Sequence, residues 1–156
     1  MKLTNLHVVL PENWFEVPDV KPREFRSIDD ETGRLQISLN PPLAPDTDPL
    51  NDLRLILAGT SDLGEEQAAE LDEFPTGPVA TLLFKSPRVG LFQAWLISHP
   101  DASIFATYTM GSLARAQYEL RESSHILRGM RIVSTMDDFV PYSPPPEEPR
   151  PWWKFW

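Results

Sequence analysis

The side chains that could perform acid–base or metal chemistry are scattered along this chain. Its three histidines, His7, His99 and His125, lie far apart, and none has a second histidine at the spacing of a metal site. We interpret them as packing or surface residues. If one has a chemical role, we favour His125, because Glu122 lies about one helical turn earlier and could orient the imidazole ring.

Acidic residues occur in groups, and paired carboxylates can exchange protons or bind calcium. The groups fall in expected loops or on expected helix surfaces: Asp29, Asp30 and Glu31; Glu65 and Glu66; Glu70, Asp72 and Glu73; Asp137 and Asp138; Glu147 and Glu148. Residues 29–33 lack the alternating oxygen ligands and the final glutamate of an EF-hand loop. We therefore interpret these acids as solvated surface groups.

The sequence lacks the signatures of nucleophilic or phosphate chemistry. It contains no Gly-x-Ser-x-Gly elbow, and its seven glycines form no phosphate loop. Ser112 is explained as the N-cap of a helix. The sequence also contains no cysteine, which excludes disulfides and thiolate ligands. We predict no catalytic, cofactor-binding or metal-binding residue, and we expect a protein that is not an enzyme.

The charge of the chain restricts its partners. It carries 14 basic and 23 acidic side chains, a formal net charge of -9. Nucleic acids and anionic membrane surfaces attract basic proteins, so neither is an expected partner. A basic protein is a more favourable partner for this acidic chain, because opposite charges attract.

The N-terminal residues lack the pattern of a signal peptide, and no apolar run approaches the roughly 20 residues that span a bilayer. We expect a cytoplasmic protein without a membrane span.

Hydrophobic patterning predicts the elements that position these side chains. Strands are expected over residues 3–10, 24–28 and 34–40. Gly33 should lie in the loop between the second and third of these strands, and Leu35, Ile37 and Leu39 should face a core. A helix should begin with Asp48 as its N-cap and Pro49 in its first turn, and should end near Gly59. A second helical segment is expected after Asp62, with Ala68, Ala69 and Leu71 on its apolar side.

The second half of the chain predicts a meander followed by a helix. Strands are expected over residues 79–85, 91–98 and 103–110, and the helix over residues 112–129. The buried stripe of that helix is predicted at Leu113, Ala116, Leu120, Leu127 and Met130, and its polar side at Glu119, Arg121, Glu122 and Arg128. The fold class is therefore α+β, an antiparallel sheet with flanking helices in the order β-β-β-α-β-β-β-α. Residues 1–138 form one domain.

A change of composition after residue 138 marks a proline-rich tail over residues 139–156, which we expect to be extended. Its end carries four large aromatic residues, Trp152, Trp153, Phe155 and Trp156. Each would be costly to leave in water, so some surface should cover them. That surface could belong to the body of the chain, to a second copy, to another partner or, more weakly, to a membrane interface. These four residues are the predicted partner-binding residues.

Three segments carry a resemblance to a known family: Leu10 to Trp14, Gly33 to Ser38, and Tyr118 to Met130. Together with the order of elements, they resemble the Mog/PsbP-like α/β/α sandwich, a family with several small bacterial proteins of unknown function. The resemblance covers roughly residues 1–134 and leaves out the tail. It implies a binding or accessory role rather than a defined enzymatic activity.

Our leading hypothesis is a non-enzymatic protein-binding or accessory protein that uses an acidic surface and the aromatic tail. One alternative is a small-molecule binder or enzyme with a pocket between sheet and helix, for which Trp95, Tyr108, Glu122 and His125 are the candidate residues. Another is an immunity or antitoxin-like protein that neutralises a basic partner by charge.

Overall fold

A computed structural model describes residues 2–28, 30–60, 63–86, 90–110 and 115–136. At its centre is a seven-stranded antiparallel sheet with the strand order β2-β3-β4-β8-β7-β6-β5. Its strands are β2 (Trp14–Val17), β3 (Arg23–Ser27), β4 (Asp30–Asn40), β5 (Glu65–Phe74), β6 (Gly77–Ser86), β7 (Gly90–His99) and β8 (Ala102–Thr109).

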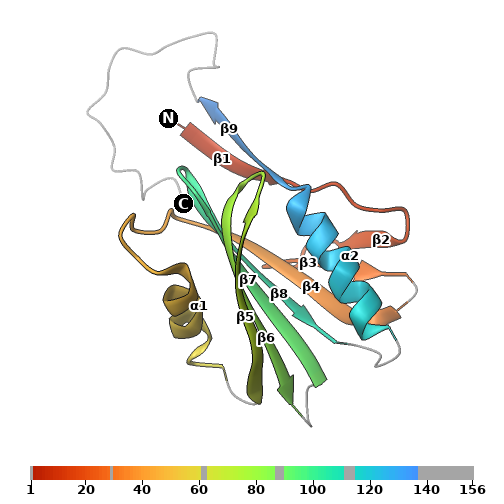
Figure 1. The fold of residues 1–156 in the computed structure, drawn as a ribbon. Coiled ribbons are helices and arrows are strands. Elements are labelled where there is room, and N and C mark those ends of the chain that lie inside the picture. The colour runs from red at the N-terminus through yellow and green to blue at the C-terminus, as the bar shows by residue number, and fades with distance from the viewer. Residues whose placement is uncertain (1, 29, 61–62, 87–89, 111–114, 137–156) are drawn as a thin grey trace, which may run out of the picture.

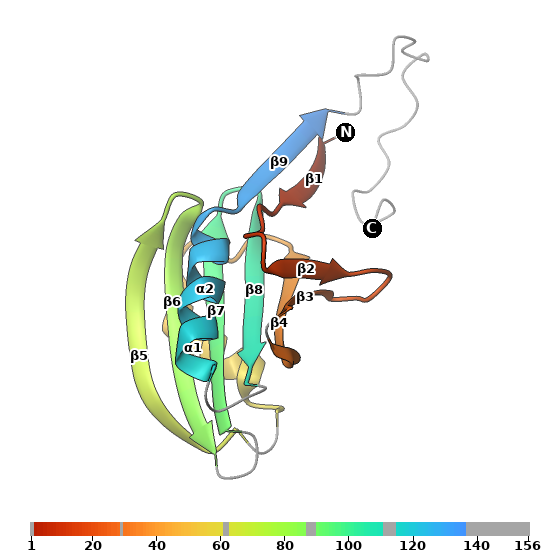
Figure 2. The same ribbon diagram turned by 90° about the vertical axis from the view of Figure 1, so that its right-hand side faces the viewer.

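Two helices cover opposite faces of this sheet (Figure 1), α1 (Pro49–Leu57) and α2 (Ala116–Arg128). The strands β1 (Lys2–His7) and β9 (Arg131–Met136) pair with each other, from Lys2 opposite Met136 to His7 opposite Arg131. Figure 2 shows this two-stranded ribbon projecting from one end of the sheet, beside the start of the chain. The predicted α+β class and the antiparallel sheet with flanking helices are confirmed.

The order of elements differs from the predicted one, because the described residues form four strands before α1, four between the helices and one after α2. Trp14–Val17 forms a strand of its own next to β3. The segment after α2 becomes β9, since β1 offers it a pairing partner. Gly33 lies within β4 and not in a loop. Ser112 lies outside the described residues.

The prediction of a second helix after Asp62 is wrong, because Glu65–Phe74 forms the edge strand β5. Glu, Gln and Ala are good helix formers, and they led the sequence-based prediction toward a helix. In the structure, the backbone of this segment pairs with β6 along its length, from Glu65 opposite Lys85 to Phe74 opposite Gly77. Tertiary pairing thus outweighs a local preference of a few tenths of a kcal/mol per residue.

Two apolar cores lie on the two faces of the sheet. On the α2 face, Phe25, Leu35, Trp95 and Tyr108 pack against the helix, and they belong to a cluster that includes Ile126 and Leu127. On the α1 face, Leu53 and Leu57 cover small and apolar residues of β6 and β7. The predicted alternation in β4 is confirmed, because Leu35 and Ile37 are fully buried and Leu39 packs against the first core.

The predicted start of α1 is confirmed. The Asp48 carboxylate accepts a hydrogen bond from the backbone N–H of Leu50 over 3.1 Å, and Pro49 occupies the first turn. This cap satisfies one of the free N–H groups at the helix start. The helix ends at Leu57, with Ala58 as its C-cap.

Candidate interaction surface

The four candidate pocket residues do not share a cavity. Trp95 and Tyr108 are fully buried in the core beneath α2, where their rings contribute packing. Glu122 is partly buried, and His125 is exposed on the outer side of the helix. None of the four lines the three hollows that the described residues form at the ends of β5.

Glu122 is held by the N-terminal part of the chain and does not orient His125. Its Oε2 accepts hydrogen bonds from the indole Nε1 of Trp14 and from Nδ2 of Asn13, both over 3.0 Å. The indole of Trp14 is almost completely buried, so this carboxylate satisfies a donor that would otherwise lack a partner. The contact fastens α2 to the segment before β2.

For a second acidic residue of α2, the sequence-based prediction of a solvent-facing position is wrong. Glu119 was predicted on the polar side, but it is fully buried, and its Oε1 accepts a hydrogen bond from the hydroxyl of Tyr108 over 2.9 Å. Arg115, four residues earlier, lies 3.9 Å from the other carboxylate oxygen. A buried carboxylate requires such partners. The sequence signal for this pair was a tyrosine on a core-facing strand, whose hydroxyl needs a partner when buried.

The three histidines lie in three different places. His7 is at the end of β1, His125 is on α2, and His99 is at the end of β7, where its Nδ1 accepts a hydrogen bond from the backbone N–H of Asp101. Within the part of the chain that the structure describes, no three His, Asp or Glu side chains gather into a group that could hold a metal ion. Trp152, Trp153, Phe155 and Trp156 lie outside the described residues.

A strongly acidic surface lies along β5, the last strand of the sheet. We call it the β5 edge surface and define it by the exposed residues Glu65, Glu66, Glu70, Leu71, Asp72 and Glu73. Figure 2 shows β5 as the outermost strand at the left-hand edge of the sheet. An edge strand presents unpaired backbone N–H and C=O groups along its outer side. The β5 edge surface therefore combines negative charge with backbone groups that can pair with another strand.

One arginine from each helix contacts this strand. Arg54 of α1 forms two hydrogen bonds with Glu66, Nε to Oε1 over 3.0 Å and Nη2 to Oε2 over 3.1 Å. Arg128 of α2 contacts Asp72 over 3.3 Å, and its guanidinium lies 4.7 Å from the centre of the Phe74 ring. The two pairs lie on opposite faces of β5, because Glu66 is opposite Phe84 on the α1 side and Asp72 is opposite Val79 on the α2 side.

The hydrogen bonds from Arg54 lower the pKa of Glu66 below its ordinary value, because they stabilise the charged carboxylate. The same contact raises the pKa of Arg54. Both side chains are solvent-exposed, so the pair contributes little to stability. Its consequence is that Glu66 keeps its charge to a lower pH than an unpaired glutamate does.

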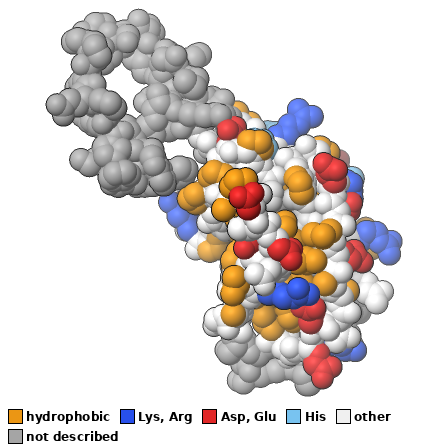
Figure 3. All heavy atoms as spheres, turned by 60° about the vertical axis from the view of Figure 1, so that its left-hand side comes forward, with side chains coloured by type: hydrophobic (Ala, Val, Ile, Leu, Met, Phe, Trp, Pro, Cys, Tyr) orange, Lys and Arg blue, Asp and Glu red, His pale blue; other side chains and the backbone are white. Residues whose placement is uncertain are grey.

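The middle of β5 keeps an excess of negative charge. Among the described side chains, neither Glu70 nor Glu73 forms a salt bridge with a basic residue, whereas Glu66 and Asp72 each have one arginine. Leu71, between Glu70 and Asp72, is 64% exposed on the α1 side. On α1 itself, Leu55 and Ile56 are also exposed. Figure 3 shows acidic groups dispersed among apolar side chains on the face that includes α1.

Three of the hollows in the described surface lie at the ends of β5. One of about 480 Å³ lies at the start of β5 and is lined by Gly64, Glu65, Gln67, Lys85 and Ser86. The other two lie at the opposite end of the strand, on either side of His99, and measure about 430 Å³ and about 290 Å³.

The described helices include none that is long and apolar enough to cross a membrane.

Comparison with known proteins identifies the fold. No protein-family model matches the chain, and no curated protein matches it by sequence. The solution structure of cyanobacterial PsbP (CyanoP) from Synechocystis sp. PCC 6803 matches with a TM-score of 0.58 and 12% identity, over 85% of this chain and 92% of that chain. LpqN, involved in cell envelope biogenesis of Mycobacterium tuberculosis, matches with a TM-score of 0.52 and 12% identity, over 86% of this chain and 85% of that chain.

These likenesses concern the fold alone. The chain has a PsbP-like α+β fold, which confirms that part of the resemblance seen in its sequence. The Mog part of that resemblance is not confirmed. Because one fold supports many functions, the role of this chain has to be argued from its own surface.

Proposed function

We propose that this chain is a non-enzymatic binding or accessory protein that contacts a basic partner protein through the β5 edge surface, with the aromatic tail as a second contact. The observation that carries the proposal is the negative charge of Glu70 and Glu73, which no described basic side chain neutralises, on a strand whose outer side pairs with no other described strand. Complementary charge speeds association and selects against acidic partners.

The mode of contact follows from the geometry of β5. An extended segment of the partner can add a strand to the sheet, and main-chain hydrogen bonds then supply affinity while side chains supply specificity. Basic side chains of such a segment would meet Glu70 and Asp72 on the α2 side. An apolar side chain would meet Leu71 on the α1 side. Acidic residues on an edge strand also oppose pairing with a second copy of the same acidic strand.

The alternative of a pocket between sheet and helix has weaker support, because Trp95 and Tyr108 are packed into the core. The immunity-like alternative is a narrower form of our proposal, in which binding neutralises a toxic basic partner. The same surface charge favours it, and it predicts the same salt dependence.

The proposal can be tested with a defined basic probe, a ten-residue peptide of alternating lysine and valine. We expect the full chain to bind it, with an affinity that falls as salt rises. The double variant Glu70→Lys/Glu73→Lys should weaken binding about tenfold or more, measured by fluorescence anisotropy. The matched control Glu12→Lys/Asp46→Lys makes the same change of net charge at exposed loop residues.

Equal loss of affinity in both double variants would mean that only net charge matters, and the proposal for β5 would then fail. The contribution of the tail is tested separately by deleting residues 149–156. We expect that deletion to leave the body folded and to remove contacts with a natural partner. An unchanged set of interactions after the deletion would contradict a binding role for the tail.

A further inference from the structure

We propose that the hairpin end of the sheet is the docking site for this chain's own aromatic segment, residues 152–156. We call this region the hairpin-end surface and define it as the two hollows that flank His99. This contact with the chain's own body differs from the partner contact that the proposed function gives to the tail, and it does not depend on a basic partner.

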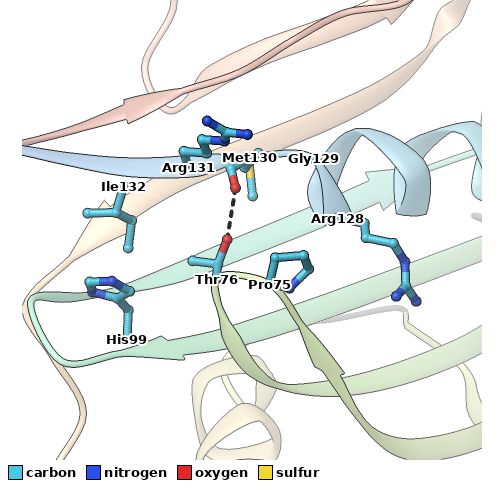
Figure 4. Close-up of a pocket in the computed structure, with 8 residues that line it drawn as sticks. All are labelled: Pro75, Thr76, His99, Arg128, Gly129, Met130, Arg131 and Ile132. Carbon is cyan, nitrogen blue, oxygen red and sulfur yellow. Dashed lines mark hydrogen bonds between the residues drawn. The ribbon is translucent and has the colours of Figure 1, made fainter.

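The two hollows share His99 as a common wall. The first, of about 430 Å³, lies beneath β9 and is bounded by Pro75, Thr76, His99 and Ile132 (Figure 4). Figure 4 shows Ile132 from β9 and His99 from the end of β7 reaching toward each other across it. The second, of about 290 Å³, lies on the other side of His99. Volumes of this size are near the lower end of the range for small-ligand pockets, about 300–1,000 Å³.

The second hollow is walled largely by prolines, which include Pro45, Pro78 and Pro100, together with Leu43. A proline ring is rigid and has no N–H group, so it presents a flat apolar surface without a donor. Such a surface suits the face of an indole or phenyl ring.

Two polar side chains at this end, Thr76 and His99, already have partners within the body. The Thr76 hydroxyl donates to the carbonyl oxygen of Met130 over 2.9 Å, and Nδ1 of His99 accepts from the N–H of Asp101 over 3.0 Å. These contacts fix the two hairpin turns in place. They also leave Ile132, the prolines and the imidazole face as the main contact area for an occupant. An apolar aromatic group fits this area better than a polar ligand does.

The tail follows directly from the strand that borders the first hollow. Ile132 lies four residues before Met136, a distance of about 13 Å along a strand. Fifteen residues separate Met136 from Trp152, and a chain of that length can span up to about 50 Å. The aromatic segment can therefore return to the hollow. Attachment in the same chain gives it an effective concentration in the millimolar range.

Charge supports the same occupant. Arg131, which borders the first hollow, is exposed and forms no ion pair with the described side chains. The tail carries Glu147 and Glu148 shortly before Trp152. These acids can approach Arg131 when the aromatic segment lies against the hairpin end, and the pairing would add to the apolar contact.

The experiment compares amide NMR spectra of the full chain and of the chain without residues 149–156. We expect the deletion to shift the signals of Thr76, His99, Asp101 and Ile132, and to leave those of Leu53 and Glu24 unchanged. A synthetic peptide of residues 149–156, added to the shortened chain, should restore the shifts in a saturable manner.

Two neighbouring variants sharpen this test. Ile132→Ser changes the wall of the first hollow, whereas Val133→Ser changes the next residue, whose side chain is 45% exposed and lies on the opposite face of β9. We expect Ile132→Ser to weaken binding of the added peptide at least fivefold and Val133→Ser to leave it unchanged. The deletion experiment needs no substitution in the body, so it decides the question even if Ile132→Ser fails to fold.

Absence of shifts at the hairpin end after the deletion would overturn the inference. Shifts that grow with protein concentration, together with a doubled mass in light scattering, would also overturn it, because the occupant would then be the tail of a second copy. Failure of the lysine–valine peptide to bind would overturn the proposed role of β5 only, since no basic probe enters the NMR comparison.

Discussion

The hydroxyl of Tyr108 donates a hydrogen bond to Oε1 of Glu119 over 2.9 Å, and both side chains are completely buried between β8 and α2. The pair joins residues from two elements that meet only in the folded state. A buried polar pair contributes a modest net stability when it is complete, but it is costly to break on one side only.

Tyr108→Phe should therefore destabilise the protein by about 1–3 kcal/mol, because the carboxylate of Glu119 loses a partner in the core. Urea unfolding followed by circular dichroism measures this change. The control is Tyr118→Phe, which removes a hydroxyl from a side chain that is 49% exposed, and it should change stability by less than about 0.5 kcal/mol. Equal unfolding midpoints for the two variants would contradict the importance of the buried pair.

Glu122→Ala removes the acceptor of the Trp14 indole and should cost about 1–3 kcal/mol. The indole N–H signal of Trp14 in the NMR spectrum should move, because that proton loses its hydrogen bond. His125→Ala is the matched control, since His125 is exposed on the same helix, and its effect should stay within about 0.5 kcal/mol. An unmoved indole signal in Glu122→Ala would mean that the contact does not exist in solution.

Gly64→Ala should destabilise the start of β5 by more than about 1 kcal/mol. Gly64 has a φ of +79°, and an added Cβ atom would meet the backbone oxygen of Lys85 and lie 2.7 Å from Cα of Ser86. Gly59→Ala provides the comparison, because no atom lies within 4 Å of its added Cβ. We expect Gly59→Ala to be neutral or slightly stabilising in thermal unfolding. A similar loss in both variants would show that the cost does not come from the geometry at Gly64.

Arg54→Gln should raise the pKa of Glu66 toward its ordinary value of 4.5, since the variant loses the hydrogen bonds that stabilise the carboxylate. Because the folded pKa is lowered, the small stabilisation by this pair is present above the unfolded pKa. It is lost as the pH falls from about 4.5 through the lower folded value. Carboxyl NMR titration measures the shift. Arg34→Gln, at an exposed residue of β4, should leave the titration of Glu66 unchanged.

Local sequence signals predicted those parts of the fold that local interactions determine. Asp48 and Pro49 start α1 as expected, because an N-cap and a first-turn proline act within one helical turn. The meander was predictable from alternating apolar residues between turns, and it forms β6, β7 and β8.

Contacts between distant parts of the chain were not predictable in this way. Trp14 and Glu122 are 108 residues apart, and no periodicity in either segment indicates their hydrogen bond. Glu119 looked like a surface acid because the helical pattern shows the type of a residue but not the tyrosine opposite it. The strand β5 was missed for the same reason, since its conformation depends on pairing with β6. The acids of β5 were recognised, but their common position on a sheet edge required the fold.

The ribbon of β1 and β9 has a mechanical consequence. Its register places Lys2 opposite Met136, at the end of the ribbon that points away from the sheet. A tensile force applied between these two residues would load the cross-strand hydrogen bonds one after another, as in opening a zipper, and not all together in shear. The ribbon should therefore open at low force while the seven-stranded sheet stays intact, and a pulling trace should show an early, gradual extension before the main rupture.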